Sequence, residues 1–254
     1  MDLPDLLHVE FETNGVGWIG YVAELPGAFV RGPTEEVSLS KGEKEVRRYA
    51  RWLGLEPKVS CTLLRTRVHR SGLCVEDADN EILLEYDRGR LDRSTFDRWC
   101  QIALFSGACF QELYDAAALR NWRDPARDRK TFNGTAPCSI REVYQHVDRV
   151  QGYYQQCLGL TPDFGSCSFT GRRRECLSRI SELYGRNSGL SVRREDGEEW
   201  TTAKALRRYI WHDRIHAKSI VRTLQRQIEE GLLDRFHDPF KFGALQTSIR
   251  SDLV

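Results

Sequence analysis

The sequence predicts an α+β protein, with a small β-rich part over residues 1–90 and an antiparallel four-helix bundle over residues 91–254. Before residue 90, short runs alternate apolar with polar residues, which is the period of half-buried strands. After residue 90, apolar residues recur at spacings of three and four, which is the period of amphipathic helices. The charge balance changes at the same point, because residues 1–90 carry 12 basic and 16 acidic side chains, whereas the remainder carries 26 and 21.

The first ninety residues predict a β-meander, one helix and further strands. An Asn-Gly pair at 14–15 and a Pro-Gly pair at 26–27 are turn signals between alternating runs. Thr34 is a suitable N-cap for a helix that ends at Gly54. The predicted strands are LHVEF (7–11), GWIGYVAEL (17–25), AFVRG (28–32), VSCTLLRTRV (59–68) and EILLEY (81–86).

Four amphipathic helices are predicted after residue 90. Ser94 is a cap for the first, in which apolar side chains repeat from Phe96 to Ala117. A polar connection at about 120–138 follows it, and the tail from residue 236 has weak periodicity. The other predicted helices are residues 139–158, 172–185 and 200–230. Four such helices joined by loops indicate an antiparallel bundle with a C-terminal extension.

The composition limits the location and the partners. No signal peptide is indicated, and nowhere do about 18 apolar residues follow one another, so no membrane association is expected. The eight cysteines form no C-x-x-C pair, which argues against a zinc ribbon and favours a reduced, cytoplasmic location. A net charge of +1 provides no global field for nucleic acid. No nucleic-acid partner is expected, whereas a small-molecule substrate and a homodimer both stay open.

Three histidines form a candidate metal site. His212 and His216 are four residues apart in a predicted helix, so both imidazoles point to the same side. His146 lies in another predicted helix, and all three flank the apolar stripe of their helix, at the edge of the bundle core. Three imidazoles can bind a divalent transition metal. The alternative is that they are ordinary half-exposed histidines.

The segments REVYQHVDRV and WHDRIHAKS, the latter after EEWTTAKALRR, resemble the DinB superfamily of bacterial four-helix bundles, over about residues 92–230. Its members typically bind a divalent metal through three such histidines. The resemblance implies a Zn²⁺ or Ni²⁺ site at His146, His212 and His216, with water in an open position, and either hydrolysis or transfer of a low-molecular-weight thiol. Where the family often has Gln after its last histidine, this chain has Ala217, Lys218 and Ser219.

The segment GWIGYVAELPGAFVRGPTEEVSLSKGEKEVRRYARWLG is similar to the HicB-like fold of small antitoxin-type domains. No DNA-binding helix-turn-helix is left to assign in this chain, so a function as a transcriptional repressor is not expected. The leading hypothesis is therefore a metal-dependent enzyme of DinB type with an appended HicB-like domain. The alternative is a non-catalytic interaction or antitoxin-like protein whose metal is structural.

Other polar side chains near the histidines are weaker candidates, and no catalytic residue is assigned. Asp148, Tyr153 and Asp213 are close to the histidines in sequence and could orient an imidazole or a substrate, but neighbouring positions on a helix usually point elsewhere. We expect all three at the surface. Three groups of arginines could hold an anionic substrate, or could simply be solvated: Arg172 to Arg174, Arg193 with Arg194, and Arg207 with Arg208.

Overall fold

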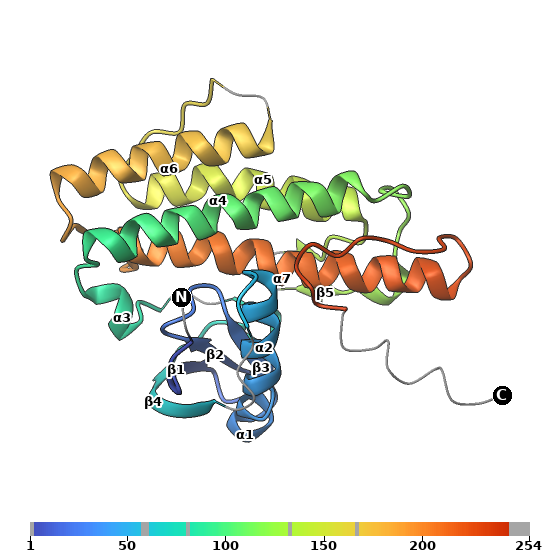
Figure 1. Cartoon of the computed structure of the whole chain (residues 1–254), viewed down its shortest axis with the longest axis horizontal. Helices are drawn as coiled ribbons and strands as arrows, with labels where there is room; N and C mark the ends of the chain where they lie inside the picture. The colour runs from blue at the N-terminus through green and yellow to red at the C-terminus, as the bar shows by residue number, and fades with distance from the viewer. Residues whose placement is uncertain (1–2, 57–60, 80–81, 132–133, 166–167, 244–254) are drawn as a thin grey trace.

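The protein is a mixed α+β molecule in which a four-stranded sheet lies against a bundle of four long helices (Figure 1). This confirms the predicted α+β class. Figure 1 shows the sheet and its helices below the bundle, in contact with the last long helix. The computed structural model describes residues 3–56, 61–79, 82–131, 134–165 and 168–243.

The sheet has the strand order β3-β2-β1-β4. Its first three strands form the predicted antiparallel meander, and β4 returns to pair with β1 in parallel. A parallel pair needs a crossover, which the helices after β3 provide. The strands are β1 (Leu6–Thr13), β2 (Trp18–Val22), β3 (Phe29–Gly32) and β4 (Thr62–Arg70).

The helix predicted from Thr34 to Gly54 is two helices, α1 (Glu35–Leu39) and α2 (Gly42–Trp52). The predicted cap is confirmed, because the Thr34 side chain accepts a hydrogen bond from a backbone N–H in the first turn of α1. The backbone N–H of the residue after α1 bonds to carbonyls two and four residues back, which closes the first helix. The chain then restarts as α2 without a side-chain cap.

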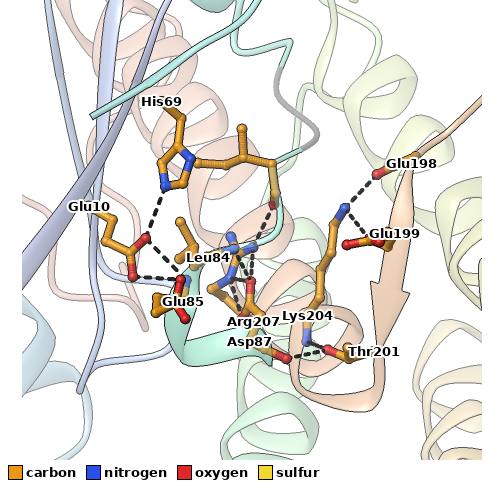
Figure 2. Close-up of polar contacts among 11 residues, drawn as sticks. Glu10, His69, Leu84, Glu85, Asp87, Glu198, Glu199, Thr201, Lys204 and Arg207 are labelled. Carbon is orange, nitrogen blue, oxygen red and sulfur yellow. Dashed lines mark hydrogen bonds and ion pairs between the residues drawn. The ribbon is translucent and has the colours of Figure 1, made fainter. Parts of the chain in front are cut away.

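The strand predicted at 81–86 is wrong. Within the described residues of that run, the chain enters a short helix, α3 (Glu85–Arg88). The backbone N–H of Glu85 donates to the Glu10 carboxylate of β1 at 3.1 Å, and Asp87 is fully buried in an ion pair with the last long helix (Figure 2). These tertiary contacts override the β propensity of the apolar run.

The four predicted long helices are present as α4 (Arg93–Asp115), α5 (Ile140–Cys157), α6 (Phe169–Arg186) and α7 (Thr202–Glu229). The cap of the first is Asp92, two residues before the predicted Ser94, because the Asp92 side chain accepts from the backbone N–H of Thr95. Short elements lie in the connections: η1 (Val75–Asp77), η2 (Pro125–Arg127), the pair β5 (Lys130–Thr131) and β6 (Gly134–Thr135), and the pair β7 (Ser191–Arg193) and β8 (Glu199–Thr201).

Helices α4 and α7 lie side by side and run in the same direction. Just before the two helices begin, the Thr201 hydroxyl donates to the Asp87 carbonyl at 2.8 Å. Near their far ends, the Gln227 side chain donates to the Leu119 carbonyl at 3.2 Å. The expectation of an antiparallel bundle therefore does not hold for this pair.

Helices α5 and α6 also run in the same direction, and both are antiparallel to α4 and α7 (Figure 1). Gln151 and Gln155 of α5 donate to the carbonyls of Phe169 and Cys176 of α6, so sequence position increases together along the two helices. The reason is the connection over 158–168. Its eleven residues can span about 36 Å, which exceeds the roughly 27 Å length of an 18-residue helix, so the chain can return to the start of α5 before α6 begins.

Two separate apolar clusters pack the sheet against α7, and Trp211 belongs to the smaller one. Trp211 of α7 lies edge-on to Tyr21 and Phe29, with ring centroids 6.4 and 6.2 Å apart. The segment after α7 folds back over the same junction, where Phe240 stacks on Trp52 of α2 at 5.5 Å. The residues from 244 onwards lie outside the described part of the chain. None of the helices in the described ranges is both long and apolar enough to cross a membrane.

Buried ion pairs join the N-terminal part to α7. Arg207 pairs with Asp87 at 2.5 Å, as Figure 2 shows. Two helical turns further along α7, Arg214 pairs with Glu45 of α2 at 2.7 Å. The ammonium of Lys218 approaches the other Glu45 oxygen at 2.8 Å. Both arginines and both carboxylates are at most 4% exposed. Removing one partner of such a pair leaves a buried charge, which costs about 3–5 kcal/mol.

Candidate metal centre

The three candidate histidines come from two neighbouring helices that run antiparallel. Ser139 begins α5 with a capping box, and Thr201 begins α7 by accepting from the backbone N–H three residues on. Both caps satisfy backbone donors that the first turn leaves free. These two starts fix the registers that place His146 on α5 opposite His212 and His216 on α7.

The structure brings the three imidazoles together. Their ring centroids are 5.0 Å apart for His146 and His212, 4.7 Å for His146 and His216, and 4.4 Å for His212 and His216. One ring nitrogen from each lies within 4.8 Å of the others. We call these three residues the histidine cluster.

Burial keeps the histidine cluster neutral. Desolvation lowers the pKa of His146, and the positive charge of Arg149 adds to the effect. The pKa of His212 and that of His216 fall well below the usual value, first because desolvation disfavours the charged ring and then because each would be repelled by a charged neighbouring imidazole. Neutral imidazole is the form that binds a metal, since a protonated nitrogen has no lone pair to donate.

The donor set fits a divalent transition metal. The Nε2 atoms of His146 and His212 are 3.1 Å apart. Two imidazole nitrogens bound to one tetrahedral zinc at about 2.0 Å would lie about 3.3 Å apart, so little movement is needed. The Nδ1 atom of His216 is buried and has no hydrogen-bond partner among the described residues. Without an ion, the 3.1 Å separation is that of a hydrogen bond between two neutral rings.

Within the described ranges, the only group of three or more histidine, cysteine or acidic side chains that fits one metal is the histidine cluster. No fourth histidine, cysteine or carboxylate therefore joins it from those ranges. An aromatic wall lies on one side, where Tyr154 is edge-on to His212 with centroids 6.1 Å apart. Three ligands with one open position is the pattern of catalytic rather than structural zinc sites.

Asp213 is not at the surface, contrary to the expectation. Its carboxylate is 1% exposed and makes two hydrogen bonds of 2.7 and 2.8 Å with the guanidinium of Arg173. Arg173 also donates to the Ala103 carbonyl and to Gln151. This buried network links α4, α5, α6 and α7 directly behind His212, so its role is to position the helix that bears the histidine.

The remaining candidates differ in their exposure. Asp148 is half-buried and pairs with Arg172 at 2.5 Å, and Tyr153 is 36% exposed. Arg207 lies in the buried pair with Asp87, and Arg194 donates to the thiol of Cys157 at 2.8 Å. None of these side chains has a hydrogen bond to the histidine cluster among the contacts of the described residues.

Comparison with protein-family models, with curated protein sequences and with solved structures finds no match to this chain.

Proposed function

We propose that the protein is a metal-dependent enzyme of DinB type, a hydrolase or a low-molecular-weight-thiol transferase, whose metal is bound by His146, His212 and His216. The metal would be a divalent transition ion, Zn²⁺ or Ni²⁺. The observation that carries the proposal is the donor set itself: three neutral, largely buried imidazole nitrogens within 4.8 Å of one another. Such a bound ion acidifies a water or thiol that occupies its open position.

The protein's own residues would hold and shield this ion. The two histidines of α7 lie on one face of a single helix, so their spacing is fixed by the helix and not by a loop. The pair formed by Arg173 and Asp213 anchors that helix at the residue next to His212. Tyr154 and the neighbouring aromatic rings exclude water from one side of the histidine cluster. The ligands are therefore pre-organised, which reduces the cost of binding.

The first experiment measures metal content. Protein purified without a histidine tag should carry about one equivalent of divalent transition metal, and His216→Ala should lose most of it. His237→Ala is the matched control, because His237 is an exposed histidine far along the tail that pairs with Glu112. Unchanged metal content in His216→Ala would refute the site.

The second experiment separates an enzyme from a structural metal. The visible spectrum of the Co²⁺-substituted protein reports coordination number and ligand exchange. With an open position, titration with azide or a small thiol between pH 6 and 10 should change the spectrum, because the ligand displaces water from the ion. A spectrum that does not change would favour the non-catalytic alternative, in which the metal only braces the bundle.

A further inference from the structure

A cavity of about 850 Å³ lies where the sheet, α2 and α7 meet, beside the histidine cluster. Its walls come from segments far apart in sequence: β2, β3, α2, η1, the connection around η2, and α7. Ile215 and Ser219, which line it, lie on either side of His216 along α7. The volume is in the range of small-molecule sites, which is about 300–1,000 Å³.

The lining of this cavity is strongly basic. Nine basic side chains face two acidic ones, Glu45 and Glu76. We call it the basic cavity, and its basic residues are Arg31, Lys41, Lys44, Arg48, Arg127, Arg129, Lys218, Arg222 and Arg226. The net charge of the whole chain is only +1, so this concentration is local.

Only part of this charge is neutralised by the protein. Lys218 pairs with Glu45, and two further arginines pair with Asp77 and Asp124. Lys44, Arg48 and Arg222 have no carboxylate within ion-pair distance among the described residues. The Nε atom of Arg48 is moreover buried without a hydrogen-bond partner there.

The basic side chains also repel one another. Burial lowers the pKa of Arg31, of Arg48 and of Arg127, and the charge of Arg222 lowers the pKa of each of the three further. Arg222 is therefore close enough to all three to raise the energy of their charged forms. A bound anion would relieve this repulsion and would also satisfy the unpaired donors.

We propose that the basic cavity binds a small polyanion, a molecule that carries two or more phosphate or carboxylate groups. Arginine guanidinium groups bind both kinds of group through paired N–H donors, and several of them around one open pocket fit more than one anionic group. The partly exposed ring of Trp18 provides a flat apolar wall for the remainder of the molecule. This inference does not rest on the metal, since the cavity and its charges exist without one.

A small molecule fits the basic cavity better than a nucleic acid. Binding along a nucleic-acid backbone needs a basic stripe over a surface, together with aromatic rings on which bases stack in succession. Here the charges converge on one volume, and its second aromatic ring, Phe29, is 5% exposed and covered by the Lys218 ammonium at 4.0 Å.

The test is isothermal titration of the full-length protein with pyrophosphate and with citrate. At least one of them should bind with a stoichiometry of about one, and the tighter of the two identifies the anionic group. The double variant Lys44→Gln/Arg222→Gln should weaken binding about tenfold or more, because each lost charge-assisted hydrogen bond contributes roughly one factor of ten. Both residues are exposed, so the fold should tolerate the change.

The matched control is Arg174→Gln/Arg186→Gln, which removes two exposed arginines from α6, away from the basic cavity. It should bind like the unaltered protein. His146→Ala should also retain anion binding, because His146 does not line the basic cavity, and this result separates the polyanion site from the metal site. The proposal is overturned if neither anion binds, if the two double variants weaken binding equally, or if only a single-stranded oligonucleotide binds.

Discussion

Gly27 is the position at which a single methyl group should separate the sheet from the helix that bears two of the histidines. It lies at the third position of a turn closed by a hydrogen bond from the Ala28 N–H to the Leu25 carbonyl, and its φ is +83°. This geometry is typical of a type II turn with Pro-Gly at its centre. A Cβ atom on Gly27 would lie 2.5 Å from Cγ2 of Ile210 and 2.8 Å from the backbone nitrogen of Trp211.

Two costs add in the variant Gly27→Ala. A left-handed φ costs an L-residue about 1–2 kcal/mol. Overlap with the backbone of α7, which cannot rotate away as a side chain can, costs about 1–3 kcal/mol more. Gly54→Ala is the matched control, because Gly54 has a φ of +69° but nothing within 4 Å of its Cβ position. The control variant should lose only the first cost.

Urea unfolding of the two variants measures both costs. We expect Gly27→Ala to lose about 2–5 kcal/mol of the free energy of unfolding and Gly54→Ala about 1–2 kcal/mol. The difference is the packing cost of the contact with α7. If the two variants lose the same free energy within about 0.5 kcal/mol, the close approach of the turn to α7 is not a constraint and the reasoning fails.

Two further predictions concern charge. Asp213→Asn should lower the free energy of unfolding by about 3–5 kcal/mol, because it leaves the buried guanidinium of Arg173 without its anion. Urea unfolding measures this loss. A loss below about 1 kcal/mol would show that this pair does not anchor α7. The histidine cluster predicts the pH dependence of the metal-free protein. Its folded pKa values lie below the unfolded value of about 6.5, so unfolding takes up protons below that pH. The stability is therefore fully present above pH 6.5 and is lost as the pH falls below it. The slope should approach 1.4 kcal/mol per pH unit for each histidine, and His212→Phe/His216→Phe should flatten it, whereas His237→Gln should leave it unchanged.

Local sequence signals predicted most of the elements. Alternation and the two turn dipeptides identified the meander, and the capping residue Thr34 identified the start of α1 to the residue. The failure at 81–86 has a non-local cause, since the helix there is held by Glu10 and Arg207, which lie far away in sequence. The parallel pairs of helices depend on the path of a connection, which has no periodicity from which it could be predicted.

The sequence predicted which histidines meet but not what surrounds them. Spacing along a helix placed His212 and His216 together, and the position of His146 beside the core placed it toward them. The basic cavity gave no such signal, because residues such as Arg31, Arg127 and Arg222 come from three unrelated elements. Only the fold brings their charges to one place.

The ion pairs between the N-terminal part and α7 have an evolutionary consequence. Arg207 and Arg214 are tolerable inside the protein only because Asp87 and Glu45 are supplied by the other part of the chain. A bundle that lost this N-terminal part would leave both cations without their anions on the helix that carries the histidines. We therefore expect descendants of this chain to gain or lose the N-terminal part and the two arginines together, and we expect the present protein to unfold in a single cooperative transition.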